Sequence, residues 1–126
     1  MTFQGDERGL LGDKGHYDEQ RYPIQWNTVN EDVLNHYKAL AGLRKNVPAL
    51  RSSAIRFYTA KNGMMAFFRG HDDEVLVVAN SWRKPAELQL PPGEWKVIWP
   101  ENHDGSKAVS GAIEVPPISV LVLERG

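Results

Sequence analysis

The chain has 126 residues, of which 41% are hydrophobic and 25% charged, a composition typical of one folded domain and unlike that of a disordered chain. Its formal net charge of −1 gives no general attraction for nucleic acid or an anionic membrane, and neither is expected as a partner. The lack of cysteine excludes disulfides and thiolate zinc sites, and no apolar run reaches the ~20 residues that span a bilayer.

The N-terminal stretch "MTFQGDERGLLGDKGHYDEQRYPIQW" combines glycines, acids, arginines and aromatic residues, as the rim of an active site often does. Hydrolysis of a glycosidic bond uses two carboxylates held ~5–9.5 Å apart on rigid elements. The acids of this stretch all lie on one short segment, and nothing downstream supplies a matching partner. A solvated loop acid or a helix cap is therefore the favoured interpretation for each of the candidates, which are Asp6, Glu7, Asp13, Asp18 and Glu19.

The next segment, "TVNEDVLNHYKALAGLRKNVPAL", predicts one helix that ends before Pro48, because proline cannot continue a helix. Thr28 stands three residues before Glu31, which is the capping-box spacing, and Asn30 is a rival N-cap. A single apolar stripe is formed at helical spacing by Val33, Leu34, Tyr37, Leu40, Ala41 and Leu43. Such a stripe needs a partner layer. That layer is either the rest of this chain or polypeptide outside it, and the second possibility is a first indication of a larger fold.

Beyond Pro48 the spacing of apolar residues changes to the period of two that marks strands. Seven short runs rich in β-branched and aromatic residues follow, with turn residues between them. They read "AIRFYTA", "MMAFFRG", "EVLVVANS", "AELQL", "EWKVIW", "AIEV" and "ISVLVLE". The pattern predicts a mainly β fold, in which residues 51–126 form an antiparallel sandwich and residues 1–50 a separate N-terminal part.

Three tryptophans in or beside the predicted strands, Trp82, Trp95 and Trp99, could stack on the apolar faces of sugar rings. Trp95 and Trp99 would share one face of an unbroken strand. Packing in the core or between domains is the favoured alternative, and Trp26 is likewise interpreted as a packing anchor. No metal or cofactor is expected, because no two histidines have the spacing of a helix-borne metal pair among His16, His36, His71 and His103.

Four stretches occur in an order and spacing that resembles the C-terminal part of the alpha-amylase family, glycoside hydrolase family 13. They are "FQGDERGL", "RYPIQW", "VLNHYKALAGLRKNVPALR" and "AFFRGHDDEVLVVANS". Within that family they resemble neopullulanases, cyclomaltodextrinases and maltogenic amylases. The resemblance implies that residues 2–4 end the last strand of a (β/α)8 barrel and that residues ~30–46 are its eighth helix. It also implies a Greek-key β-sandwich, the C-terminal domain, packed against that barrel.

The resemblance also implies what this chain lacks. The family's nucleophilic aspartate, acid/base glutamate and stabilising aspartate come from the fourth, fifth and seventh strands of the barrel, all upstream of residue 1. None of them can be carried over, and the catalytic set in this chain is expected to be empty. In the family the acids that correspond to Asp6 and Glu7 mostly support the barrel mouth, at the face where such barrels build their active sites.

A second segment matches a substrate-binding pattern of the family. Arg21, Pro23 and Trp26 match a D-P-x-x-R-R-P-x-x-W stretch whose acid and arginine touch glucose units on the non-reducing side of the cut. Asp18 is the matching acid, although it stands one residue nearer to Arg21 than usual, and Tyr22 replaces the second arginine. A carboxylate and a guanidinium suit this task because both form forked hydrogen bonds with adjacent hydroxyls.

The expected function is that of a C-terminal fragment of a retaining alpha-1,4-glucan hydrolase, acting on starch-type oligosaccharides, cyclodextrins or pullulan and inactive by itself. Its partners would be the missing barrel and, through the parent enzyme, alpha-glucan oligosaccharides. The surface that the barrel would cover favours self-association of the isolated chain. The alternatives are a non-catalytic carbohydrate-binding or structural sandwich and a sucrose- or trehalose-acting relative. Localisation stays undetermined with the cytoplasm favoured, because the first residues do not read as a signal peptide.

Overall fold

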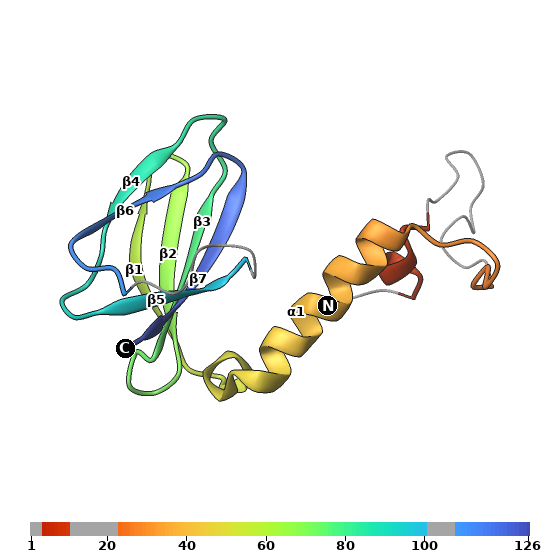
Figure 1. Cartoon of the computed structure of the whole chain (residues 1–126), viewed down its shortest axis with the longest axis horizontal. Helices are drawn as coiled ribbons and strands as arrows, with labels where there is room; N and C mark the ends of the chain where they lie inside the picture. Colours follow the sequence, from red (N-terminus) through yellow and green to blue (C-terminus); the bar gives the residue numbers. More distant parts are fainter. Residues whose placement is uncertain (1–3, 11–22, 101–107) are drawn as a thin grey trace. The chain divides into compact units, whose positions relative to one another are not determined.

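The computed structural model describes residues 4–10, 23–100 and 108–126, and its secondary structure is mostly antiparallel β (Figure 1). The chain divides into two compact units, Met1–Asn46 and Val47–Gly126. The first contains a short 3-10 turn and one helix, and the second contains seven strands among its described residues. The prediction of a mainly β chain with one N-terminal helix is confirmed.

The helix of the first unit, α1, spans Glu31–Asn46, as the apolar stripe and Pro48 predict. Asn30 is its N-cap, because the side-chain Oδ1 accepts a hydrogen bond from the backbone N–H of Val33 at 3.2 Å. The Thr28 hydroxyl instead donates to the Gln25 carbonyl at 3.2 Å, so Thr28 does not begin a capping box. No residue of α1 is buried, which leaves its apolar stripe partly open.

The second unit is a sandwich of two antiparallel sheets, preceded by a 3-10 turn, η2, over Pro48–Arg51. All seven predicted strands are present. The larger sheet has the order β1-β2-β3-β7-β5, and the smaller one pairs β4 with β6 (Figure 1). Their bounds are β1 Ile55–Lys61, β2 Met64–Arg69, β3 Val75–Asn80, β4 Ala86–Gln89, β5 Trp95–Trp99, β6 Ala112–Val115 and β7 Ser119–Arg125.

The hydrophobic core lies between the two sheets. Trp95 is fully buried at its centre, and its indole Nε1 donates to the Pro91 carbonyl at 3.0 Å, so that the buried N–H is satisfied. Leu88 and Val115 close the core from the small sheet, at 3% and 0% exposure. The large sheet contributes Met64, Ala66, Phe68, Leu76, Val78, Val97, Leu121 and Leu123.

Strand β5 contains a register shift that the sequence does not predict. Val97 pairs with Leu123 of β7, but Trp99 pairs with the adjacent residue Val122. Neighbouring residues of a strand point to opposite faces, so Trp99 lies on the opposite face of the sheet from Val97. The expectation that Trp95 and Trp99 share one face is therefore wrong, because it assumed an unbroken strand.

Asn80, at the end of β3, is the one polar residue among the described residues that is buried, at 2% exposure. Its Oδ1 accepts a hydrogen bond from the backbone N–H of Trp82 at 2.9 Å. Its Nδ2 donates to three carbonyls, those of Lys84 at 2.9 Å, Val115 at 3.2 Å and Pro116 at 3.0 Å. Because Val115 ends β6, this single side chain ties the large sheet to the small one.

Candidate functional site

The "GDERG" segment forms a tight turn, η1, over Asp6–Arg8. Gly5 and Gly9 flank it with φ of 91° and 68°, left-handed conformations that residues with a side chain rarely adopt. The backbone N–H groups of Arg8 and Leu10 both donate to the Gly5 carbonyl, at 3.0 and 3.1 Å. The Glu7 carboxylate turns back and accepts a hydrogen bond from the Gly5 N–H at 3.1 Å. Glu7 therefore acts on the turn itself and holds its shape.

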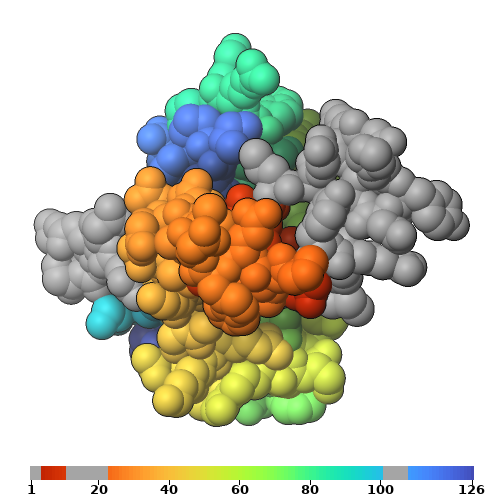
Figure 2. All heavy atoms as spheres, turned by 90° about the vertical axis from the view of Figure 1, so that its right-hand side faces the viewer, coloured from red at the N-terminus to blue at the C-terminus, as the bar shows by residue number. Residues whose placement is uncertain are grey.

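Arg8 fastens this turn to the segment that leads into α1. Its Nη2 donates to the carbonyls of Trp26 and Thr28, both at 2.8 Å, and its guanidinium lies 5.4 Å from the Trp26 ring centroid. The Arg8 carbonyl in turn accepts a hydrogen bond from Asn30 N–H at 2.9 Å. Figure 2 shows residues 4–10, in red, against the orange segment that precedes α1. These contacts of Arg8, which we call the Arg8 clamp, hold the turn and the helix N-terminus together.

Gly9 allows the close approach that this clamp requires. A Cβ at Gly9 would lie 2.9 Å from the Cβ of Asn30, which is shorter than such contacts ever are in proteins. Glycine is therefore needed here both for its positive φ and for the space it leaves to the helix N-cap. The two glycines of "GDERG" have a structural reason that is independent of any ligand.

Two of the four predicted site residues belong to this turn. Asp6 is exposed and Glu7 is half-buried, and they stand next to each other on η1. Arg21 and Asp18, the predicted substrate contacts, lie outside the described residues. Trp26, interpreted as a packing anchor, is 75% exposed and contacts Arg8. The described residues do not bury it.

The three tryptophans of the sandwich are in different places and do not form one platform. Trp95 is completely buried, so for this residue the core alternative is the right one. Trp99 is half-buried, on the side of the large sheet that faces away from β4 and β6. Trp82 is 47% exposed and packs over the turn at Gly63, where a Cβ would come within 2.1 Å of its Cδ1. Only Trp82 keeps much of its indole open to a ligand.

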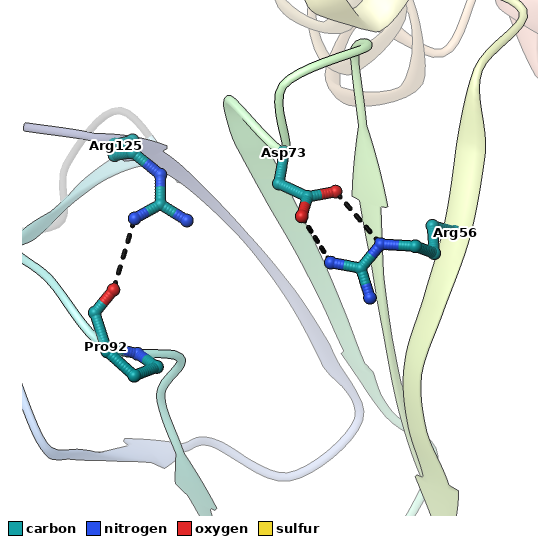
Figure 3. A network of polar contacts seen from close by, with 4 residues as sticks. All are labelled: Arg56, Asp73, Pro92 and Arg125. Atoms are coloured by element: carbon teal, nitrogen blue, oxygen red, sulfur yellow. Dashed lines mark hydrogen bonds and ion pairs between the residues drawn. The ribbon is translucent and has the colours of Figure 1, made fainter.

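Two arginines of the sandwich are occupied by structural contacts (Figure 3). Arg56 forms a two-pronged ion pair with Asp73 and lies 4.4 Å from the Phe68 ring centroid. The hydrogen bond that Arg56 donates to the Asp73 carboxylate is the main cause that raises the pKa of Arg56 above its ordinary value. Arg125 donates to the Pro92 carbonyl at 3.1 Å and lies 4.6 Å from the ring centroid of buried Trp95. Both cations cover the edge of the aromatic core.

Within the described ranges, no three His, Asp or Glu side chains come together in a way that could hold a metal ion. In the part of the chain that the structure describes, no helix is long and apolar enough to cross a membrane, and this includes α1.

The described elements define a class: a seven-stranded antiparallel sandwich, preceded in sequence by a helix and a glycine-flanked turn. Residues 55–126 match the family model described as "Alpha amylase, C-terminal all-beta domain". Since this match covers more than half of the chain, the chain belongs to that family. The predicted likeness to the alpha-amylase family is confirmed.

Relatives and solved structures agree with this assignment. The chain is 76% identical to the type III pullulan hydrolase from Thermococcus kodakarensis, with a TM-score of 0.84 over 98% of this chain and 20% of that one. It is 26% identical to a cyclomaltodextrinase of Geobacillus thermopakistaniensis over 95% of this chain and 22% of that protein. An alpha-amylase from H. orenii shares the fold with a TM-score of 0.75 at 22% identity. The chain spans about a fifth of the curated relatives it matches.

Arg8 is the residue of the N-terminal unit whose role sequence reasoning missed. Its hydrogen-bond partners lie 18 and 20 residues further along the chain, so no local pattern points to them. The sequence shows only that Arg8 follows two acids and precedes a glycine, which does not identify its partners. Sequence reasoning likewise assigned no role to Asn80, whose hydrogen bonds join the two sheets.

Proposed function

We propose that the chain is the C-terminal part of a retaining alpha-1,4-glucan hydrolase that acts on starch-type oligosaccharides, cyclodextrins or pullulan. The observation that carries this proposal is the 76% identity to a type III pullulan hydrolase over 98% of the chain, which is only 20% of that enzyme. The reacting carboxylates of such an enzyme would then lie on the preceding polypeptide. By itself the chain is expected to be inactive.

In the whole enzyme the reaction would proceed by double displacement, with a covalent glycosyl intermediate and retention at the anomeric carbon. The present chain would add no reacting group to it. Its part would be to complete the mouth of the barrel with Asp6 and Glu7 and to contact glucose units through Arg21 and Asp18. The terminal βα unit of the barrel would comprise residues 1–50, and the C-terminal domain would comprise residues 51–126.

The clamp at Arg8 supports this division of roles. It fixes the turn that carries Asp6 and Glu7 against the segment that begins with Trp26, the last residue of the predicted substrate-binding stretch. Glu7 is directed back to the Gly5 N–H, as a supporting residue would be. A substrate-binding arginine a few residues before Trp26 would thus be carried by a segment with a fixed end, which favours a defined geometry.

The first experiment measures hydrolysis by the purified 126-residue chain. Maltoheptaose, cyclodextrin and pullulan are incubated with it, and reducing ends are counted against a buffer blank. No product is expected. Sustained hydrolysis that follows the protein through purification would refute the proposal that the reacting groups lie on other polypeptide.

The second experiment examines Arg21 in the enzyme that carries the barrel. We expect Arg21→Lys to raise KM for maltooligosaccharides by roughly tenfold with a smaller change in kcat, because a point charge replaces a forked donor pair. Arg83→Lys, on an exposed loop of the sandwich, is the matched control and should leave both constants unchanged. Equal kinetics for both variants would remove Arg21 from the substrate site.

The alternative function, a carbohydrate-binding sandwich, rests on the exposed indole of Trp82. Calorimetry with maltoheptaose separates the two, because a binding module gives saturable heat that Trp82→Ala abolishes. We expect no such heat from the chain.

Two further expectations belong to the proposal. The isolated chain should self-associate, which light scattering measures. The parent protein should be cytoplasmic, which fractionation of the source cells measures.

A further inference from the structure

The turn between β1 and β2 contains the one Asn-Gly pair of the sequence, Asn62–Gly63. Lys61 pairs directly with Met64, so these two residues form the whole loop. Both have a positive φ, 53° at Asn62 and 71° at Gly63, as in a type I′ turn. Both are also exposed. A side-chain amide thus stands on the surface beside a peptide N–H that has no Cβ to shield it.

This pair has a chemistry of its own, because asparagine is thermolabile and its amide can react with the following peptide nitrogen. The Gly63 nitrogen attacks Cγ of Asn62 and a bond forms between them, while the bond from Cγ to Nδ2 breaks. The N–H proton leaves with the amide nitrogen as ammonia, and a five-membered succinimide ring remains. Water then opens the ring at either carbonyl, which returns a proton to the Gly63 nitrogen and gives aspartate or isoaspartate. The reaction becomes faster as pH rises, since the attacking nitrogen must lose its proton.

Both reacting groups of this turn are available. In the described part of the chain, no hydrogen bond holds the Asn62 side chain or occupies the Gly63 N–H. The pair Asn80–Ser81 is an internal comparison, because serine is also a small residue. There the asparagine is 2% exposed and its amide group makes four hydrogen bonds, while the Ser81 N–H donates to the Gly63 carbonyl at 2.9 Å. Of the two pairs, only the one in the turn has both groups free to react.

The folded turn nevertheless opposes the reaction. In the succinimide the Gly63 nitrogen and the Asn62 Cβ must lie on the same side of the Asn62 Cα–C bond, because both belong to one five-membered ring. This requirement fixes ψ of Asn62 well outside the range of a type I′ turn, in which ψ of that residue is about +30°. The turn must therefore open transiently before the ring can close.

Two residues that follow β3 hold this turn closed, and we call them the turn cap. They are Ser81 and Trp82. The Gly63 carbonyl accepts hydrogen bonds from the Ser81 N–H at 2.9 Å and from the Ser81 Oγ at 2.8 Å. Trp82 packs over Gly63 so closely that a Cβ there would lie 2.1 Å from its Cδ1. The backbone N–H of Trp82 is in turn held by Asn80 Oδ1 at 2.9 Å. Opening the turn breaks contacts of the cap, so a weaker cap exposes the reactive conformation more often.

We propose that Asn62 is a site of spontaneous deamidation and that the turn cap sets the rate of this reaction. This chemistry does not depend on the function proposed above. The two products differ in their effect on the fold. Aspartate keeps the turn, because Asp-Gly favours the same type I′ geometry as Asn-Gly. Isoaspartate lengthens the main chain within a two-residue loop, so Lys61 and Met64 can no longer pair in the same way and the Gly63 carbonyl moves away from Ser81.

The test incubates the purified 126-residue chain at neutral and at mildly alkaline pH, folded in buffer and unfolded in urea. Samples are digested with pepsin at low pH, where the reaction is slow, and the peptides are weighed; isoaspartate is detected with an isoaspartyl methyltransferase. The variants are Ser81→Ala, which removes one hydrogen bond of the cap, and Trp82→Ala, which removes its ring. Ser53→Ala, at an exposed serine outside the cap, is the matched control, and Asn62→Gly removes the reacting amide. A cooperative urea transition verifies that each variant is folded.

We expect Asn62 to convert before any other asparagine of the described ranges and faster at the higher pH. In the folded chain its conversion should be at least about tenfold slower than in the unfolded chain. Ser81→Ala should accelerate the reaction of the folded chain about two- to tenfold, as for the loss of one net hydrogen bond, and Trp82→Ala by at least as much. Both variants should match wild type in urea, and Ser53→Ala should match it in both states.

Each part of the proposal can fail separately. Earlier conversion of another described asparagine would overturn the site, and equal rates in the folded and unfolded chain would overturn the restraint by the turn. Equal rates for Ser81→Ala and Ser53→Ala would overturn the role of the cap, and this comparison decides alone if Trp82→Ala does not fold. The aged chain gives a further readout: its aspartate form should melt like Asn62→Asp, and its isoaspartate form at a lower temperature. Equal melting of the two forms would contradict the stated effect on the hairpin.

Discussion

Asn80 offers the sharpest test of how the two sheets are joined. Asn80→Ala leaves the N–H of Trp82 and three carbonyls without their side-chain partner, in a place that is 2% exposed. Each net hydrogen bond contributes about 1 kcal/mol, and a buried group left unsatisfied costs about 1–3 kcal/mol. Some of the carbonyls can regain water at the loop, so we expect a loss of about 2–4 kcal/mol in the free energy of unfolding.

Asn80→Asp preserves the shape and reverses the polarity. The carboxylate can still accept from Trp82 N–H, but its second oxygen would face carbonyls that now have no donor. Burial and these carbonyls should both raise the pKa of the introduced carboxyl above the value of about 3.9 expected in the unfolded chain. The unfolded state then binds fewer protons than the folded state, so stability relative to wild type falls as pH rises through this window.

The assay is urea unfolding of the whole chain, followed by near-ultraviolet circular dichroism of the buried Trp95, at pH 5 and pH 8. Asn80→Asp should be less stable than Asn80→Ala at pH 8 and should recover part of the difference at pH 5, where a protonated carboxyl can donate to one carbonyl. A loss below about 1 kcal/mol for the alanine variant, or a pH-independent loss for the aspartate variant, would refute this account of the joint between the sheets.

Three further predictions concern single contacts. Gly63→Ala should lower the free energy of unfolding by at least about 1–2 kcal/mol in thermal melts, because φ is +71° and its Cβ would meet Trp82 at 2.1 Å; an unchanged melt would mean that the ring moves freely. Glu114→Lys should raise the free energy of unfolding by about 0.2–1 kcal/mol, and by less at high salt, because it replaces the repulsion between Glu114 and the directly opposite Glu87 by an attraction. A change that does not depend on salt would contradict this charge argument. Arg8→Met should speed amide exchange at the first turn of α1, as measured by NMR, whereas Arg83→Met should not.

The sequence predicts well where the helix and the strands lie, and less well which face of a sheet each side chain occupies. All seven strands and the helix follow from periodicity and turn residues, which act locally. The shift in β5 that moves Trp99 to the other face has no local signature, because "EWKVIW" reads as an unbroken strand. The apolar character of both faces of the large sheet did have a signal. The runs "VLVV" in β3 and "VLVL" in β7 are continuously apolar, as in strands buried on both faces.

The same distinction applies to the candidate site. Glycine, Glu7 and the neighbouring acids identify a tight turn, and the resemblance suggests where it belongs. The partners of Arg8 could not be predicted, because 18 to 20 residues separate them and hydrogen-bond geometry decides between competing donors. Arg21 and Asp18 lie outside the described residues, so their role as substrate contacts stays a prediction.

The two units differ in what holds them together, and this difference bears on function. The sandwich closes its own core around Trp95, whereas α1 has 16 residues and buries none of them. Isolated helices of about this length are marginal in water, so the N-cap at Asn30 and the Arg8 clamp can define where α1 begins but contribute little to keeping it folded. The remaining stabilisation must come from a surface that covers its apolar stripe. The unit that carries the predicted sugar contacts is therefore expected to depend, for the order of its helix, on a surface that covers this stripe.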